Sequence, residues 1–441
     1  MTKKLRESSE IRLDPWISLY ARRTSGLSAS EVRSLFAVAS RPEVVSLAGG
    51  MPYVKALGDD VIQESVARVM STNGPKALQY GSGQGEPALR ERITEVMALE
   101  GIVSGADDIV ITTGSQQGLD LVTRLFIDPG DVILTEGPSY VGALGVFRSY
   151  QAEVVHVPMD ADGLTPQALE ETIVRLRAAG KTIKFLYTIP DFHNPAGVTL
   201  AASRRPEILA ITQRHGVLLV EDNPYGLLYF NAPPPDAIRA IDDRGILYLG
   251  SFSKTLAPGF RVGWVLAPHA IREKLILEQE SAVLSPSSFS QLVITDYLEH
   301  ADWKEQIATF RGIYRERRDA MLDALSEYLP QLSWTHPDGG FYVWLSLPEG
   351  MNSKAMLPLA VRELVAYTPG TAFYSDGGGA SEIRLSFCYP APEEIRVGIQ
   401  RLAHVISNEA QLLDTFGTGG EQIDFDGASG SHISSPPPNL N

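Results

Sequence analysis

The sequence has almost none of the features that mark secreted or membrane proteins. Its 441 residues include a single cysteine, Cys388, so an intrachain disulfide and a metal site built from several cysteines are both excluded. No apolar run approaches the roughly 20 residues that a membrane-spanning helix needs. The basic N-terminus is not followed by an apolar stretch, so it lacks the pattern of a signal peptide. We therefore expect a cytoplasmic protein that does not act at a membrane.

Positive charge is also scarce. The chain has 38 Lys and Arg against 53 Asp and Glu, which gives a formal net charge of −15. An acidic surface repels phosphate backbones, so this balance disfavours nucleic-acid binding. It does not exclude a small anionic substrate, because a few arginines can reverse the potential inside a cleft.

Short apolar runs alternate with helical stretches between about residues 105 and 270. They are continuous and rich in β-branched residues, which is typical of strands buried on both faces. The runs occupy residues 109–112, 132–135, 154–157, 185–189, 217–220, 246–249 and 262–265. Their alternation with helices predicts an α/β fold with an open, mostly parallel sheet between helices.

The composition changes along the chain and predicts four parts. Two apolar runs flank a glycine-rich turn within residues 334–347, and residues 382–387 are a further strand candidate, so a smaller α+β domain is expected there. The parts are an N-terminal segment with a helix at 28–39 (1–45), a large domain (46–310), a small domain (311–412) and a disordered tail (413–441) rich in Gly, Ser, Asp and Pro.

A lysine with two serines follows the run at 246–249. Open α/β sheets bind ligands at the carboxyl ends of their strands, and a partly desolvated lysine there could form a Schiff base. Ser251 and Ser253 precede Lys254, and together with Arg261 they could bind a phosphate. Taken alone, this pattern fits an exposed lysine near a turn better.

Three other strand ends carry residues with two interpretations each. Asp222 could pair with a protonated pyridine nitrogen, or simply cap a turn. Asn194 could donate to the phenolic oxygen of a pyridoxal ring, although its Asn-Pro sequence also fits an ordinary turn. Tyr140 could stack on a flat ring, or serve only in packing.

A helix start and a strand arginine complete the candidates. Ser115 and Gln116 open a helix whose free N–H groups could bind a phosphate, yet an ordinary capped helix has the same pattern. Arg384 alternates with apolar residues and therefore needs a partner, either a substrate carboxylate or an internal acid.

Together these motifs resemble, in order and spacing, the fold-type I pyridoxal-5′-phosphate (PLP) enzymes. The similarity is to the class I and II aminotransferases, in the branch that holds α-aminoadipate and kynurenine aminotransferases and the aminotransferase-like domains of MocR regulators. It covers about residues 28–410. The segments that carry it are 47–52, 78–80, 115–116, 138–140, 194–197, 221–222 and 251–254, with Arg261 and Arg384.

The resemblance implies a role for each cofactor residue and no metal. Lys254 would hold PLP as a Schiff base and move the proton, Asp222 would pair with the pyridine nitrogen, and Tyr140 would stack on the ring. The ring hydroxyl would be bound by Asn194 and Tyr225. The phosphate would be bound by Ser115, Gln116, Ser251, Ser253 and Arg261, and by Tyr80 of the neighbouring subunit in a homodimer.

On the substrate side, the resemblance implies that Arg384, Asn194 and the backbone near Gly50 hold the α-carboxylate. Arg33 matches an arginine that reads a distal carboxylate in some relatives, with a solvated helix face as the equal alternative. His193 beside the ring could be a second acid or base toward substrate, but a hydrogen-bonding or packing histidine is favoured.

The implied reaction moves an amino group between an L-amino acid and a 2-oxo acid by a ping-pong mechanism. Two alternatives share the same site: a β/γ-elimination or replacement enzyme, and a PLP-sensing domain without catalysis. The sensing domain is disfavoured, because only about 45 residues precede Leu47 and they show no DNA-binding pattern. His193, Asp191 and Gly226 depart from the usual residues of relatives, which leaves open a role in specialised metabolism.

Overall fold

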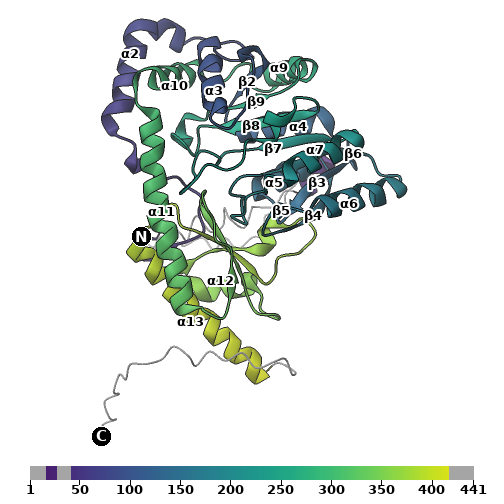
Figure 1. Ribbon diagram of the computed structural model, residues 1–441, viewed down its shortest axis with the longest axis vertical. Coiled ribbons are helices and arrows are strands. Elements are labelled where there is room, and N and C mark those ends of the chain that lie inside the picture. Colours follow the sequence, from purple (N-terminus) through teal and green to yellow (C-terminus); the bar gives the residue numbers. More distant parts are fainter. Residues whose placement is uncertain (1–15, 27–40, 417–441) are drawn as a thin grey trace, which may run out of the picture.

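The computed structural model describes residues 16–26 and 41–416. Within them the chain forms an eight-stranded sheet and a four-stranded sheet joined by a long helix, and a separate two-stranded pair (Figure 1). The expected helix at 28–39 and the tail from residue 417 lie outside the described residues. No helix in the described ranges is both long and apolar enough to cross a bilayer.

The large sheet has eight strands in the order β2-β9-β8-β7-β6-β3-β4-β5. The strands are β2 (Ile109–Thr112), β3 (Val132–Gly137), β4 (Glu153–Asp160), β5 (Gly163–Leu164), β6 (Ile183–Thr188), β7 (Leu218–Asp222), β8 (Ile246–Ser251) and β9 (Gly263–Leu266). The five central strands β4, β3, β6, β7 and β8 pair in parallel, whereas β9 is antiparallel to β2 and β8 and β5 is antiparallel to β4. The predicted mostly parallel sheet is therefore confirmed.

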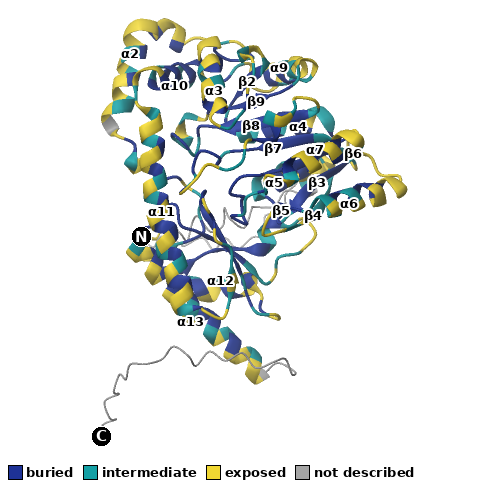
Figure 2. Cartoon of the chain, viewed as in Figure 1, coloured by how far each residue is buried: buried dark blue, intermediate teal, exposed yellow. Residues whose placement is uncertain are grey.

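Helices cover both faces of this sheet, which explains why its strands are continuous apolar runs. Every residue of β2, β8 and β9 is buried, and Figure 2 shows the strands as the dark interior. One apolar cluster joins the sheet to α4 (Ser115–Phe126), α5 (Val141–Ser149) and α9 (His269–Val283). A second cluster joins it to α6 (Pro166–Ala178) and α7 (Arg204–Arg214).

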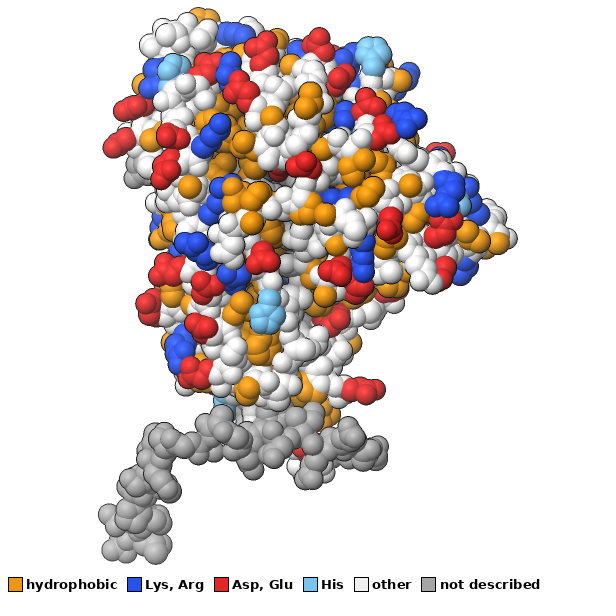
Figure 3. All heavy atoms as spheres, in the orientation of Figure 1, with side chains coloured by type: hydrophobic (Ala, Val, Ile, Leu, Met, Phe, Trp, Pro, Cys, Tyr) orange, Lys and Arg blue, Asp and Glu red, His pale blue; other side chains and the backbone are white. Residues whose placement is uncertain are grey.

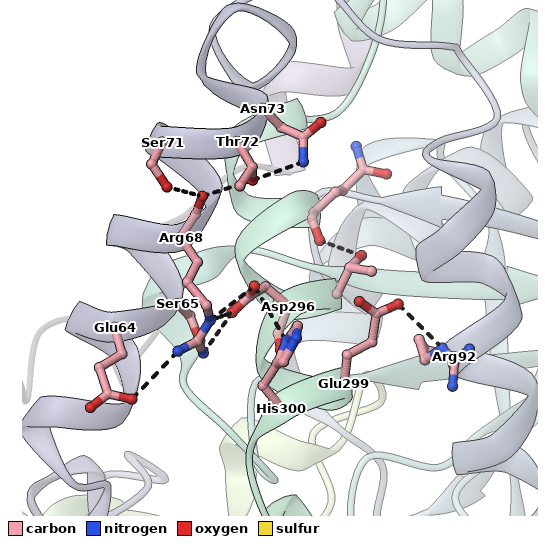
Figure 4. Close-up of polar contacts among 12 residues, drawn as sticks. Glu64, Ser65, Arg68, Ser71, Thr72, Asn73, Arg92, Asp296, Glu299 and His300 are labelled. Carbon is pink, nitrogen blue, oxygen red and sulfur yellow. Dashed lines mark hydrogen bonds and ion pairs between the residues drawn. The ribbon is translucent and has the colours of Figure 1, made fainter.

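Three helices pack together beyond the β2 edge of the sheet: α2 (Asp59–Ala77), α3 (Pro87–Ala98) and α10 (Ser288–His300). The guanidinium of Arg68 on α2 lies 2.8 Å from a carboxylate oxygen of Asp296 on α10, and Glu64 lies one helical turn before it (Figure 4). A glycine-rich turn at residues 80–85 separates α2 from α3.

The smaller sheet has four antiparallel strands in the order β10-β11-β14-β13. Their bounds are β10 (Ser333–Trp334), β11 (Tyr342–Ser346), β13 (Thr368–Pro369) and β14 (Glu382–Ser386). The two apolar runs predicted around the glycine-rich turn within residues 334–347 form the antiparallel pair β10–β11, with Trp334 opposite Leu345. Arg384 lies on β14 opposite Trp344 of β11, so its side chain starts from the small sheet and not from the large one.

Helices α11 (Trp303–Tyr328), α12 (Ser353–Arg362) and α13 (Pro392–Phe416) pack around the small sheet, beside the parallel pair β1 (Val45–Ser46) and β12 (Val365–Ala366). The predicted domain boundary at residue 310 falls inside α11, and α13 continues past the predicted end at 412. The remaining short helices are α8 (Ile238–Ile241), η1 (Ile17–Leu19), η2 (Arg22–Gly26), η3 (Val54–Ala56), η4 (Ala106–Asp108), η5 (Pro258–Phe260) and η6 (Gly370–Phe373).

Candidate active site

A cavity of about 360 Å³ lies at the carboxyl ends of the central strands, within the size range of small-molecule sites. It brings together predicted residues from segments that are far apart in the sequence. Those that line it are Gly50, Ser115, Tyr140, Asn194, Asp222, Tyr225, Ser251, Ser253, Lys254 and Arg384. The sequence did not single out Met51, Val141, Gly142, Ile189, Pro224 or Tyr342, which line it as well.

Lys254 follows the end of β8 and points into this cavity rather than to bulk solvent. Its Nζ donates a hydrogen bond to the carbonyl oxygen of Gly50 at 2.8 Å and lies 5.5 Å from the ring centroid of Phe341. Burial lowers the pKa of this amine to about 8, so a neutral, nucleophilic amine is accessible near neutral pH. The alternative of an exposed lysine near a turn does not describe this position.

Asp222, at the end of β7, is buried and only half paired. Its Oδ2 accepts a hydrogen bond from the hydroxyl of Tyr187 on β6 at 2.7 Å. Its Oδ1 has no hydrogen-bond partner among the described residues. Burial raises the pKa of Asp222 to about 6, and the bond from Tyr187 opposes that rise. A buried carboxylate oxygen left free at a cavity wall fits a protonated ring nitrogen of a ligand.

Several groups that suit an anion lie together where α4 begins. Ser115 is the first residue of this 12-residue helix, and Gly114 before it has φ of 77°. A Cβ at Gly114 would lie 2.5 Å from a guanidinium nitrogen of Arg261, so only glycine lets that side chain lie against the helix start. On the same wall, the hydroxyl of Ser251 accepts from the backbone N–H of Ser253 at 3.0 Å. Free helix N–H groups, hydroxyls and a guanidinium suit a phosphate.

Tyr140 precedes α5 and is held by Gln116 from α4. Its hydroxyl donates to the Gln116 side-chain oxygen at 3.2 Å, while the Gln116 amide donates to the carbonyl of Gly142 at 3.1 Å. Burial raises the pKa of Tyr140 to about 12, so its hydroxyl stays protonated. Gln116 itself is not on the cavity wall, and in this structure it fixes the position of Tyr140.

Arg384 reaches the cavity from the small sheet and keeps its positive charge available. It donates to the side-chain oxygen of Asn194 at 2.9 Å and to the carbonyl of Ala48 at 2.6 Å. Its guanidinium carbon lies 4.3 Å from the ring centroid of Tyr342 and 4.8 Å from that of Phe373. Within the described residues no Asp or Glu pairs with it, so the alternative of an internal acid is not met there.

Tyr342 on β11 is a cavity residue that the sequence did not reveal. Its hydroxyl would lie 1.9 Å from a Cβ placed at Gly50, so the approach of these two segments requires glycine at 50. Its ring also lies edge-on to Tyr225, with centroids 6.1 Å apart. No local pattern distinguishes Tyr342 from the core residues of its apolar run, because the contact depends on where the small sheet meets the large one.

Besides Gln116 and Arg261, two predicted residues do not line the cavity in this single chain, and a third lies outside the described residues. His193 is 1% exposed, with its Nε2 3.0 Å from a carboxylate oxygen of Glu136 and its Nδ1 accepting from the backbone of Ala196. This geometry agrees with the hydrogen-bonding alternative and shows no contact with a substrate site. Tyr80 lies on the turn after α2 and is 78% exposed. Arg33 lies outside the described residues.

The comparisons with known proteins agree with this geometry. The model of the family "Aminotransferase class I and II" matches residues 43–402. This chain belongs to that family. It is 41% identical to aromatic-amino-acid aminotransferase 1 of Thermococcus litoralis, over 93% of this chain and 99% of that protein. It is 34% identical to 2-aminoadipate transaminase of Thermus thermophilus, over 90% of this chain and 99% of the relative. The predicted family is thereby confirmed.

Solved aminotransferases also share the fold. The crystal structure of Pyrococcus horikoshii kynurenine aminotransferase, in complex with PMP, is 38% identical to this aminotransferase and superposes with a TM-score of 0.85, over 89% of this chain and 98% of that one. The predicted fold type is therefore confirmed. The uncharacterized transcriptional regulator YisV of Bacillus subtilis is 32% identical over 78% of this chain and 71% of its own length.

Proposed function

We propose that this protein is a PLP-dependent aminotransferase that moves an amino group between an L-amino acid and a 2-oxo acid by a ping-pong mechanism. The observation that carries the proposal is that Lys254 and Asp222 line the same cavity, and that one carboxylate oxygen of Asp222 has no hydrogen-bond partner among the described residues. The cavity thus offers an amine for a carbonyl and a free carboxylate oxygen for a ring nitrogen. The helix start at Ser115, beside Arg261, offers an anion site in addition.

Each residue has a defined task in this proposal. PLP, when bound, supplies an electron sink for the electron pair that remains after the substrate loses its Cα proton. Lys254 holds the cofactor and, once displaced by the incoming amino acid, carries that proton. Asp222 keeps the ring nitrogen protonated, and Tyr140 lies against the ring.

The remaining tasks concern binding. Asn194 and Tyr225 hold the ring hydroxyl. The phosphate is held by Ser115, Ser251, Ser253 and Arg261, with Gln116 acting through Tyr140. Arg384 binds the substrate α-carboxylate, because its guanidinium donates to the neutral oxygens of Asn194 and Ala48, which leave its positive charge available to an anion.

We extend the proposal to a cytoplasmic homodimer with shared active sites. Two exposed side chains on the turn after α2 support it: Leu78 is 73% exposed and Tyr80 is 78% exposed. Large apolar side chains exposed side by side are commonly covered by a partner. Tyr80 would then reach the phosphate of the neighbouring subunit. Figure 3 shows acidic and basic side chains interspersed over the visible face, without the single basic patch that a nucleic-acid partner would require.

The test is the absorption spectrum of the purified protein with PLP, followed by single amino acids without any oxo acid. The panel begins with aromatic amino acids, 2-aminoadipate and kynurenine, for which relatives are named. We expect a visible Schiff-base band that a true donor converts to a shorter-wavelength band, with release of one oxo acid per site. Lys254→Ala should lose the Schiff-base band and at least about a hundredfold in rate, whereas Lys274→Ala serves as the matched control.

Three outcomes would contradict the proposal. Release of ammonia or of a side-chain fragment without an acceptor would establish elimination or replacement on the same scaffold. A protein that binds PLP on Lys254 but converts no amino acid would act as a sensor. Absence of any cofactor band in the wild-type protein would remove PLP chemistry altogether.

A further inference from the structure

Two neighbouring segments carry the three residues assigned above to the ring nitrogen and the ring hydroxyl of the cofactor. One is the loop 190–197 after β6, which holds Asn194, and the other is the turn 222–226 after β7, which holds Asp222 and Tyr225. A side-chain hydrogen bond joins the two segments outside the cavity. The amide nitrogen of Asn223 donates to a carboxylate oxygen of Asp191 at 2.9 Å.

The same amide also holds its own turn. The side-chain oxygen of Asn223 accepts from the backbone N–H of Gly226 at 2.9 Å, so one side chain fixes the turn and ties it to the loop. Asn223 and Asp191 are 4% and 1% exposed, and neither lines the cavity. Hydrogen bonds in such a dry environment are strong, and an amide that lost its partners there would be costly.

The loop end of this connection is anchored on helix α7. The second carboxylate oxygen of Asp191 lies 2.5 Å from a guanidinium nitrogen of Arg205, whose side chain is 1% exposed. Arg205 donates in addition to the carbonyls of Leu200 and Asp236 at 3.3 and 3.0 Å. The loop, the turn and α7 are therefore linked by a continuous set of buried polar contacts.

Gly226 is part of the same arrangement. A Cβ at this position would lie 2.6 Å from a carboxylate oxygen of Glu100 and 2.7 Å from the amide nitrogen of Asn223. Any side chain at 226 would thus displace the Asn223 amide. Asp191 and Gly226 are two of the three positions that the resemblance marks as unusual, the third being His193, and in the structure both contact Asn223.

We propose that Asp191 and Asn223 are positioning residues that set the separation between Asn194 and Tyr225. They act through the backbone: Asp191 lies three residues before Asn194, and Asn223 lies between Asp222 and Tyr225. This inference rests on the proposed function, because it concerns the two donors assigned to one ring oxygen. Such paired donors need placement within about 0.5 Å, which two loops without a connection would not guarantee.

The consequence is measurable in the cofactor itself. Donors to the ring oxygen compete with the protonated imine for that oxygen, so well-placed donors lower the pKa of the lysine–cofactor Schiff base. Asn223→Ala removes the connection and should raise this pKa by about one unit, with roughly tenfold weaker PLP binding. Gly226→Ala deletes no hydrogen-bonding group but displaces the amide, and should shift the Schiff-base pKa in the same direction.

The matched control is Gln291→Ala. Gln291 is another fully buried amide that bridges two segments: it accepts from the backbone N–H of Glu86 at 2.8 Å and donates to Pro286. It lies on α10, away from the cavity. We expect this variant to lose thermal stability to an extent comparable with Asn223→Ala while its Schiff-base pKa and PLP affinity stay at wild-type values.

The experiment titrates the Schiff-base absorbance against pH for wild type and the three variants, with PLP affinity and melting temperature measured in parallel. The proposal is overturned if Asn223→Ala and Gly226→Ala lower only the melting temperature, as the Gln291 control does. Failure of PLP binding looks different, since the wild-type protein would then show no Schiff-base band at all. Elimination or sensing in place of transamination would appear only in the amino-acid panel and would leave this titration unchanged.

Discussion

Glu221 and Asp222 are neighbours at the end of β7, and their side chains lie on opposite faces of the large sheet. Both are buried, at 0% and 5% exposure. Both oxygens of Glu221 accept backbone N–H groups, from Ile238 and Arg239 at the start of α8, each at 2.8 Å. Asp222 has the Tyr187 hydroxyl on one oxygen and no partner among the described residues on the other.

The contrast separates a carboxylate with both oxygens hydrogen-bonded from one with an oxygen left for a further partner. Burial raises the pKa of Glu221 to about 7 and that of Asp222 to about 6, so the direction of the shift does not distinguish them. What distinguishes them is satisfaction of their hydrogen bonds, because a buried polar atom without a partner costs free energy unless a ligand supplies one. The face with the free oxygen is the face with the cavity.

The largest expected effect is on the cavity side of β7. Asp222→Asn removes the negative charge that would keep a ring nitrogen protonated, while it preserves the shape of the side chain. We expect kcat/KM for transamination to fall by at least about a hundredfold, a loss typical of removing one electrostatic contact to developing charge. Steady-state kinetics of the PLP-saturated variant measure it. Activity within a few-fold of wild type would mean that Asp222 has no partner in the cofactor.

On the opposite face, Glu221→Gln should affect folding and leave the chemistry intact. One acceptor oxygen becomes an N–H₂ group, so a backbone N–H of α8 loses its partner at a cost of about 1–3 kcal/mol. The free energy of unfolding from denaturant titration measures this change. The rate per PLP-loaded subunit should match wild type, and a rate as low as that of Asp222→Asn would erase the distinction between the two faces.

A smaller effect is expected from Tyr187→Phe, which removes the side-chain hydrogen bond that Asp222 accepts from the Tyr187 hydroxyl. The hydrogen bond from Tyr187 stabilises the carboxylate and lowers its pKa, so its loss raises that pKa above the value of about 6. PLP binding needs Asp222 ionised. Affinity should therefore weaken as the pH falls through about 6 in the wild-type protein, and at a higher pH in the variant. PLP dissociation constants measured across acidic and neutral pH would show it.

For Tyr187→Phe, the wild-type protein is the control, since the titration of the PLP phosphate is common to both. Identical pH profiles would show that Tyr187 only packs beside Asp222.

The sequence predicted the strands well because their pattern is local. The run at 109–112 coincides with β2, and the run at 246–249 lies inside β8, which continues to Ser251. Several strand ends were placed too early, since backbone pairing extends into polar residues: Asp222 pairs with Leu249 although it follows the predicted run at 217–220. The end of β6 was placed one residue too late. The antiparallel direction of β9 was not predicted, because it depends on where the chain re-enters the sheet.

The sequence predicted the cavity residues that follow strand ends, such as Lys254, Asp222 and Asn194. Tyr187, Tyr342 and Asn223 were missed for a common reason. Each acts through a contact to a segment distant in sequence, and its own neighbourhood is an ordinary apolar run or turn. Their detection requires the pairing of strands and the meeting of the two sheets, which single-sequence periodicity does not contain.

The excess of acidic residues has a kinetic consequence at the cavity. The chain carries a net charge of −15, yet Lys254, Arg261 and Arg384 lie in or beside the cavity. At low ionic strength the distant acidic side chains repel an anion before it reaches these cations. Physiological salt screens charges beyond about 8 Å and so removes the repulsion while the short-range attraction survives. Moderate salt should therefore speed the arrival of an oxo acid.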